Sequence, residues 1–312
     1  MSSATPPHAA SASPMPEGVT DPNYRPLPGR LGNLTVTQLH TLEKFKKELQ
    51  DEGHFVPERM DDATLLRFLR ARKFDLAKAK IMLISAEQWR KDEKVDEIAK
   101  GFDFPEKAAI DEFYPQYYHK CDKDGRPIYI ESLAHLDIDK MNKTFGEERL
   151  REVLPRRFIY EYEKFLNERL PACSKAVGHP VETSCTILDL GGVALTSYPK
   201  VSKYVMDAAS IGQNRYPECM GKFYIINAPS VFTWIWYGIK RFLDEVTVSK
   251  IAILSPTEYQ EKLKEQIPVE NLPVEYGGTC KCEGGCSSSD AGPWNPPTGK
   301  NALENGDAEG SK

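Results

Sequence analysis

The segments Thr183-Ser-Cys-Thr-Ile-Leu-Asp-Leu190 and Gly221-Lys-Phe-Tyr-Ile-Ile-Asn227 decide the fold of this chain. Both are apolar runs of strand length, and a segment of helical pattern lies between them at about 199–213. Two further runs of this kind, Pro127–Leu133 and Lys250–Leu254, are joined to them by connections long enough for helices. Strands that alternate with helices pair in parallel, so the sequence predicts an α/β fold with a mostly parallel sheet.

The region that precedes these strands has a helical pattern. From Thr35, apolar residues recur at steps of three and four until Gly53 interrupts the run. Two more helices are expected at about 61–74 and about 76–91, the first of them opening on an aspartate cap. The sequence therefore predicts a small all-helical subdomain in front of the sheet.

The two ends of the chain differ in composition from both of these regions. The beginning is rich in Pro, Ser and Ala, and the end is rich in Gly, Ser, Asp and Asn, which is typical of disorder. The predicted organisation is a disordered leader at 1–32, a helical subdomain at 33–98, a sheet domain at 99–279 and a disordered tail at 280–312.

Charge and hydropathy exclude several classes of protein. The 312 residues carry a net charge of −5, which argues against a nucleic-acid binder, because such affinity comes mainly from Lys and Arg. No apolar segment is long enough to cross a bilayer, and the first residues contain no secretion signal. The seven cysteines, an odd number, favour reduced thiols and a cytoplasmic location.

Three of these cysteines, Cys280, Cys282 and Cys286, stand close together near the end of the chain. A structural zinc site needs four ligands at recognisable spacings, and no Cys or His follows these three. We therefore expect solvated thiols in a flexible tail and no metal site.

Signatures of catalysis are missing from the sequence. It contains no phosphate loop, dinucleotide-binding turn, nucleophile elbow or zinc-protease motif. The six histidines are scattered, and none stands beside an obvious nucleophile. The sequence therefore predicts that the protein is not an enzyme.

An aromatic run occupies residues 231–243, Val-Phe-Thr-Trp-Ile-Trp-Tyr-Gly-Ile-Lys-Arg-Phe-Leu. As a helix it is apolar on nearly every face up to Lys240, so it must be buried in protein or contact lipid. It is too short to span a bilayer, which requires about 20 apolar residues. A core helix and a mobile apolar lid both fit this pattern.

Polar side chains interrupt the predicted apolar elements. Ser184 and Thr186 are two residues apart, so their hydroxyls point to the same face of the sheet. Lys250 leads into four apolar residues, where an ammonium group needs an anionic partner. Each hydroxyl has an ordinary explanation as a core group bonded to backbone, but together such residues can also line a cavity for a phosphate-bearing ligand. Tyr118, Tyr129 and Tyr162 belong to the same pattern. A second, charged set includes Arg72 and Lys73, which close the second predicted helix, where the helix dipole also explains cations. Glu218 precedes the third predicted strand, and Thr247 lies with Lys250 at the entry to the fourth.

Several ordered segments match a known family. They are Leu65–Phe74, Phe113–His119, Asp122–Pro127, Leu170–Ser174, Val181–Thr186, Met220–Pro229, Val246–Lys250 and Asn271–Gly278. In these segments the chain resembles the fungal phosphatidylinositol/phosphatidylcholine transfer proteins, which belong to the CRAL-TRIO lipid-binding family. The resemblance implies a CRAL-TRIO domain whose sheet floors an apolar lipid pocket, closed by a gating helix and preceded by the helical subdomain.

The resemblance also implies roles for individual residues. The positions that match the family's phosphatidylcholine-binding residues, which we call the choline set, are Tyr118, Tyr129, Tyr162, Ser184 and Thr186. The positions that match its phosphatidylinositol-binding residues, the inositol set, are Arg72, Lys73, Glu218, Thr247 and Lys250. The implied gate residues are Phe232, Trp234, Ile235, Trp236, Ile239 and Phe242.

The chain departs from the family pattern at several places, including the two bulky tryptophans of the gate, and two of the departures lie near the implied headgroup residues. Pro155 is expected to break the long helix predicted at about 146–170, which leaves the register of Tyr162 open. Cys219 follows Glu218 where a basic residue is usual, which is expected to weaken an anion contact nearby.

The function that the resemblance implies is exchange of phosphatidylinositol and phosphatidylcholine at membranes, in support of phosphoinositide signalling and Golgi secretory traffic. It implies no cofactor besides the bound phospholipid, transient contact with a membrane surface, and a phosphatidylinositol kinase as a partner. The protein is expected to be a cytoplasmic monomer, peripherally associated with Golgi or endosomal membranes. The alternative is a carrier of a retinoid, tocopherol or sterol on the same fold, for which the lysines of the inositol set have no purpose.

Overall fold

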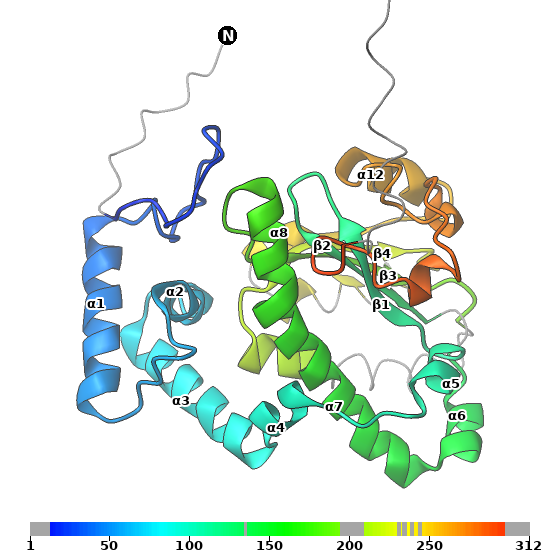
Figure 1. The fold of residues 1–312 in the computed structure, drawn as a ribbon, viewed down its shortest axis with the longest axis horizontal. Helices are drawn as coiled ribbons and strands as arrows, with labels where there is room; N and C mark the ends of the chain where they lie inside the picture. The colour runs from blue at the N-terminus through cyan, green and yellow to red at the C-terminus, as the bar shows by residue number, and fades with distance from the viewer. Residues whose placement is uncertain are drawn as a thin grey trace, which may run out of the picture. The chain divides into compact units, whose positions relative to one another are not determined.

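The structure is a computed structural model that describes residues 13–133, 136–193, 209–229, 232, 236–237, 240–242 and 245–296. The chain divides into two compact units (Figure 1). Each unit buries an apolar cluster of its own. The helical unit comprises the chain up to Lys100 together with residues 178–180 and 207–218. The sheet unit comprises the remaining residues.

The helical unit confirms the three predicted helices. They are α1 (Val36–Asp51), α2 (Asp62–Ala71) and α3 (Leu76–Asp92), followed by the short α4 (Val95–Lys100). Each of the three long helices begins at a side-chain cap: Thr35 forms a reciprocal capping box with Gln38, and Asp61 and Asp75 cap the next two. Between the helices lies an apolar core that includes Phe45 and Leu69, both fully buried.

The leader was expected to be disordered, but its residues 13–32 pack on the helical unit. Ser13 is buried, and its Oγ accepts a hydrogen bond of 3.0 Å from the backbone N–H of Gly32. Arg70 donates to the carbonyl of Gly29 at 3.1 Å, which ties the leader to α2. Composition missed this because the segment is held by contacts with distant residues rather than by a pattern of its own.

In the part of the sheet unit that the structure describes, five strands lie in the order β1-β2-β3-β4-β5. The four predicted strands are present as β2 (Pro127–Ser132), β3 (Ser184–Asp189), β4 (Met220–Ile226) and β5 (Ile251–Ile253), and they pair in parallel. The first strand, β1 (Gln116–Cys121), was not predicted and pairs with β2 in the antiparallel direction. The α/β fold with a mostly parallel sheet is therefore confirmed.

One nearly continuous helical segment joins β2 to β3. After α6 (Ile138–Phe145) it consists of α7 (Glu147–Lys164), one turn of π-helix (Phe165–Arg169) and α8 (Leu170–Val177). The expectation that Pro155 breaks this helix was wrong. Pro155 lies on the exposed side of α7, where water can bond the carbonyl that the missing N–H leaves free.

The sheet has two faces with different cover. On what we call the α12 face, side chains such as those of Ile128 and Ile187 pack against α12 (Tyr259–Gln266) and the chain that follows it. On the opposite side, the α7 face, side chains such as those of Leu188 and Ile225 pack with residues of α6 and α7. Figure 1 shows α12 and α7 on opposite sides of the strands.

The tail was also expected to be disordered, but residues 280–296 pack on β1. Cys280 and Cys286 are buried, and the backbone N–H of Lys120 in β1 donates to the carbonyl of Ala291 at 2.6 Å. Trp294 packs against Tyr118 with 6.4 Å between ring centroids. The Gly/Ser-rich composition did not predict this packing, because the segment is held by contacts with a strand more than a hundred residues earlier in the chain.

Candidate functional site

The α7 face carries a row of side chains that crosses all five strands. The register aligns Tyr118 with Tyr129, Tyr129 with Thr186, Thr186 with Phe223, and Phe223 with Ile251. The row is therefore polar on β1 to β3 and apolar on β4 and β5. Such a floor can hold a molecule that has a polar end and an apolar body.

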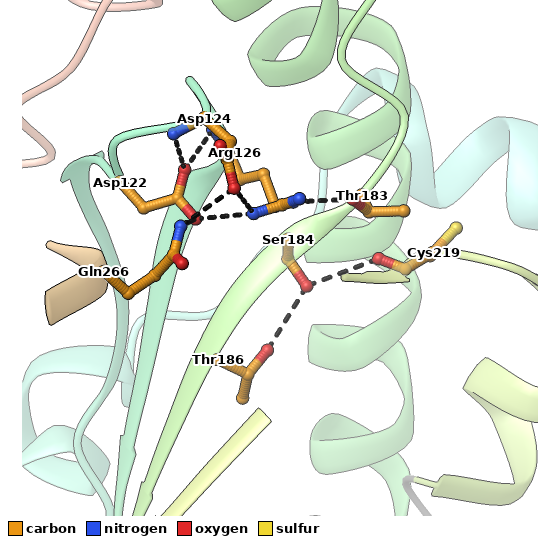
Figure 2. Close-up of polar contacts among 8 residues, drawn as sticks. All are labelled: Asp122, Asp124, Arg126, Thr183, Ser184, Thr186, Cys219 and Gln266. Carbon is orange, nitrogen blue, oxygen red and sulfur yellow. Dashed lines mark hydrogen bonds and ion pairs between the residues drawn. The ribbon is translucent and has the colours of Figure 1, made fainter. Parts of the chain in front are cut away.

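The choline set gathers at the polar end of this row. Ser184 and Thr186 have their hydroxyl oxygens 3.2 Å apart, and the Ser184 hydroxyl also donates to the carbonyl of Cys219 at 3.4 Å (Figure 2). The rings of Tyr118 and Tyr129 are 5.0 Å apart. Tyr162 and Tyr118 both contact the ring of Phe165, at 6.5 and 5.8 Å. The three tyrosines and the two hydroxyls thus come from β1, β2, β3 and α7.

The tyrosines of this set are neutral hydroxyl groups at any physiological pH. Burial raises the pKa of Tyr118, of Tyr129 and of Tyr162 above the ordinary value for a phenol. A buried neutral hydroxyl can donate one hydrogen bond without the desolvation cost of a charge. The polar end of the floor therefore offers donors and ring faces.

Arg169, which sequence reasoning missed, adds a cation to this group. Its guanidinium lies 4.2 Å from the ring centroid of Tyr118, and its Nη2 contacts Glu161 at 3.1 Å and Asp290 at 3.5 Å. The side chain is buried, and among the described residues its Nε and Nη1 have no hydrogen-bond partner. A guanidinium carries five N–H donors, so it can serve acceptors beyond these two carboxylates.

A charged turn fixes the strand ends beside this group. Arg126 pairs with Asp122 at 3.0 Å and with Asp124 at 2.5 Å, and Gln266 of α12 donates to both carboxylates (Figure 2). Arg126 also donates to the hydroxyl of Thr183 at 3.2 Å. Burial raises the pKa of Asp122, and Arg126 opposes this rise. The turn thereby anchors β2 to the residue that precedes Ser184.

A half-buried carboxyl group on the α7 face was also missed. Glu131 lies in the next row of the sheet, opposite Gln116 and Leu188, and accepts a hydrogen bond from the hydroxyl of Tyr114. Burial raises its pKa, while the hydrogen bonds and the guanidinium of Arg157 oppose the rise. Arg157 interrupts the apolar stripe of α7, which is a signal that the sequence contained.

The inositol set is divided between the two units. Arg72 and Lys73 follow α2, and Glu218 lies 3.7 Å from Arg70, all within the helical unit. Lys73 and Glu218 have positive φ angles of 52° and 61°, a conformation that non-glycine residues rarely adopt and that often marks functional sites.

The other two members of the inositol set belong to the sheet unit. Thr247 and Lys250 lie on α11 (Glu245–Lys250), three residues apart and therefore on one face of the helix, and both are half-buried. Lys250 is the last residue of this helix rather than the first of β5.

Comparison with known proteins identifies the family. A family model for the CRAL/TRIO domain matches residues 111–278, and one for the CRAL/TRIO N-terminal domain matches residues 41–85. This chain belongs to the CRAL/TRIO family. It is 50% identical over 279 residues to the Sec14 cytosolic factor of Schizosaccharomyces pombe, covering 89% of this chain and 94% of that protein.

More distant CRAL/TRIO relatives extend this likeness. A phosphatidylinositol/phosphatidylcholine transfer protein of Arabidopsis thaliana, SFH4, is 41% identical over 272 residues, covering 84% of this chain and 44% of that protein. The crystal structure of Sfh5 superposes with a TM-score of 0.57 at 19% identity, over 78% of this chain and 88% of that one. At this identity the superposition supports the CRAL/TRIO fold alone.

The gate expected in this CRAL/TRIO domain lies largely outside the described residues, which include none of Trp234, Ile235 and Ile239. Phe232 and Trp236 are helical and half-buried, and Phe232 packs against the apolar cluster of the α7 face. Phe242 ends a short 3-10 turn. Among the described residues, no helix is long and apolar enough to cross a membrane. A groove of about 560 Å³ lined by α3 and Arg215 belongs to the helical unit, so it is not the pocket expected over the sheet.

Proposed function

We propose that this protein exchanges phospholipids between membranes, holding one phosphatidylinositol or phosphatidylcholine in a gated apolar pocket over the α7 face. The observation that carries the proposal is the row from Tyr118 to Ile251, polar at one end and apolar at the other. Similarity to Sec14 cytosolic factors and to proteins named as phosphatidylinositol/phosphatidylcholine transfer proteins supports it.

The energetics of lipid transfer explain why such a pocket is needed. Two acyl chains contain about 30 methylene groups, and each costs about 0.8 kcal/mol in water, or roughly 25 kcal/mol in total. A lipid therefore does not cross water alone at a useful rate. The apolar part of the floor, from Phe223 to Ile251, replaces the bilayer interior as the environment of the chains.

The choline set suits the headgroup of phosphatidylcholine. The hydroxyls of Ser184 and Thr186 can turn from each other toward phosphate oxygens, and Arg169, close to Tyr118, has two donors without partners among the described residues. Tyrosine faces attract a quaternary ammonium through cation–π contact. A zwitterionic headgroup would thus meet donors for its phosphate and rings for its choline.

For phosphatidylinositol we propose that the residues of the inositol set bind the headgroup, each within its own unit. In the helical unit, Arg72 and Lys73 supply positive charge and Glu218 an acceptor. In the sheet unit, Lys250 supplies positive charge and Thr247 an acceptor. The positive φ angles of Lys73 and Glu218 support a role in binding, because such backbone strain is retained where a precise side-chain direction matters.

Membrane contact is proposed for the second half of the 231–243 run and the residues after it. Tyr237 is 53% exposed, with the cationic groups of Lys240 and Arg241 at 4.7 and 4.6 Å from its ring, and Val246 is 61% exposed. An exposed aromatic ring beside basic residues suits the boundary between headgroups and acyl chains. We propose that the protein acts as a cytoplasmic monomer that touches Golgi or endosomal membranes transiently and opens its gate there.

Within the cell, this exchange would support phosphoinositide signalling and Golgi secretory traffic, with inositol lipid presented to a phosphatidylinositol kinase. The first test is mass spectrometry of the lipids that copurify with the protein. Phosphatidylinositol and phosphatidylcholine are expected. A retinoid, tocopherol or sterol in their place would contradict the proposal and favour a different cargo on the same fold.

A second test separates the two headgroup sites. Lys250→Ala should lower transfer of phosphatidylinositol between vesicles and leave transfer of phosphatidylcholine intact, because the lost charge serves only the inositol set. Lys262→Ala, at an exposed lysine paired with Glu265, is the matched control and should change neither. Equal loss of both activities in Lys250→Ala would show damage to the fold instead of loss of a headgroup contact.

A further inference from the structure

The end of the described chain brings three cysteines to a histidine of the sheet. Cys280, Cys282 and Cys286 surround His119 of β1, and the four ligand atoms all lie within 4.8 Å of one another. His119 is fully buried, Cys280 and Cys286 are buried, and Cys282 is half-buried. The fourth ligand that the sequence lacked near these cysteines therefore comes from 161 residues before Cys280.

The distances within this group, which we call the thiol–imidazole cluster, are close to those of a tetrahedral metal site. Zinc–sulfur bonds of about 2.3 Å place two sulfurs about 3.8 Å apart, and a sulfur and a nitrogen about 3.5 Å apart. The sulfurs of Cys280 and Cys282 are 3.8 Å apart, and Nε2 of His119 is 3.3 Å from the sulfur of Cys280. The ligand atoms that lie farthest apart, within 4.8 Å of each other, have to approach by roughly 1 Å to reach these distances.

The histidine is oriented as a metal ligand usually is. Its Nε2 faces the sulfurs, and its Nδ1 is 3.2 Å from the hydroxyl of Ser289. That hydroxyl donates its own proton to the carbonyl of Cys286 at 2.9 Å, so its oxygen can accept a hydrogen bond from Nδ1–H of His119. A hydrogen bond of this kind fixes the tautomer and leaves Nε2 with a free lone pair.

The loop between the cysteines is shaped to turn back on itself. Gly284 and Gly285 have φ angles of 73° and 94°, which glycine alone adopts without strain, and the N–H of Gly285 donates to the carbonyl of Cys282 at 3.0 Å. The turn returns Cys286 to the side of Cys282. Close approach of three sulfurs thus follows from the backbone of this loop.

We propose that His119, Cys280, Cys282 and Cys286 bind one zinc ion as a structural site. Four protein ligands complete the tetrahedron and leave no position for water or substrate, which distinguishes structural from catalytic zinc. The three cysteines bind as thiolates and release their protons, while His119 binds as neutral imidazole. A disulfide between two of the cysteines would leave the third thiol and the orientation of His119 unexplained.

Zinc at this cluster would fasten the end of the chain to the edge strand of the sheet. The same segment carries Asp290 and Trp294, which pair with each other at 3.0 Å and both contact Arg169. His119 is also the strand neighbour of Tyr118. Binding of the ion would therefore stabilise the packing behind the polar end of the α7 face, although the site does not depend on which ligand that face binds.

The first experiment measures metal in the full chain, produced with zinc in the medium and purified without chelators. Elemental analysis should give one zinc per chain, and removal of the zinc should lower the melting temperature. Refilling with cobalt should give the visible absorption of a tetrahedral ion and a thiolate-to-cobalt charge-transfer band. A wild-type chain that takes up neither metal under reducing conditions, or that contains a Cys280–Cys282 disulfide instead, would overturn the proposal.

Variants test which residues hold the ion. Cys282→Ser should lose the zinc, whereas Cys121→Ser, at a half-buried cysteine outside the cluster, should keep it. Ser289→Ala leaves all four ligands in place and should weaken zinc binding about 10–100-fold. Zinc that survives in Cys282→Ser, or that disappears equally in Cys121→Ser, would place the metal elsewhere and reject the assignment. If Cys282→Ser does not fold, the cobalt spectrum of the wild type and the affinity of Ser289→Ala decide.

Discussion

The two faces of the sheet are made by alternate residues of the same strands, yet they differ in character. On the α12 face, Ile128, Ile130, Cys185 and Ile187 have no exposed surface. On the α7 face, Tyr129, Phe223, Ile251 and Ile253 remain half-buried, and hydroxyls and a carboxyl group lie among them. Among the described residues, the α12 face keeps some exposure toward the β5 edge, for example at Tyr224 and Ala252.

This difference separates stability from binding within one sheet. A fully buried apolar face gains free energy from burial and has nothing left to offer a ligand. A face that mixes half-buried apolar side chains with buried donors is incomplete by itself, because its surface is best covered by a molecule of matching polarity. The choline set and the proposed pocket lie on the second kind of face.

The largest expected effect tests the stabilising role of the α12 face. Ile187→Ala should lower the free energy of unfolding by about 2–5 kcal/mol, because the fully buried side chain leaves a cavity. Ile253→Ala, on the α7 face, should cost about 1 kcal/mol, because its side chain is only half-buried. Denaturant unfolding of the lipid-free protein measures both. Equal losses would remove the distinction between the faces.

Most of the fold was predictable because its signals are local. Strands β2 to β5 contain apolar runs, and α1 to α3 combine helical periodicity with capping residues in sequence. Strand β1 was missed because Gln116–Cys121 is an edge strand with no apolar alternation. Its existence depends on pairing with β2, which single-sequence patterns do not reveal.

A medium effect is expected from the polar end of the α7 face. Ser184→Ala combined with Thr186→Val should weaken binding of phosphatidylcholine about 10–100-fold, because each hydroxyl contributes a hydrogen bond to a charged phosphate. Phosphatidylinositol binding should change much less. Transfer of each lipid between vesicles, with unfolding measured in parallel, provides the test.

Cys185, which lies between these two residues and points to the α12 face, gives the matched control. Cys185→Ser should reduce stability without changing the preference between the two lipids, because the new hydroxyl is buried among apolar side chains. If the double variant behaves in the same way, Ser184 and Thr186 are ordinary core residues bonded to each other and to Cys219.

The site was predictable only where its residues stand out within an element. Ser184 and Thr186 are polar in an apolar strand, so position alone marked them. Arg169 and Glu131 became visible only through their neighbours, because their burial is set by packing between distant elements. The three cysteines were interpreted as solvated residues of a tail because His119, the residue that they surround, lies on a strand that the sequence did not reveal.

The smallest expected effect concerns Glu131, the half-buried carboxyl group of the α7 face. Because burial raises the pKa of Glu131, the folded protein holds this proton at pH values where the unfolded chain, with a pKa of about 4.3, has released it. The contribution of Glu131 to stability therefore falls as pH rises through this window.

Glu131→Gln, which can still accept a hydrogen bond from Tyr114, should gain stability relative to the wild type as pH increases from about 4 toward neutrality. Unfolding measured across this range tests the prediction, with Glu112→Gln at an exposed position as the control. A constant difference between Glu131→Gln and the wild type would mean that water reaches the carboxylate and that the α7 face is wet at this end.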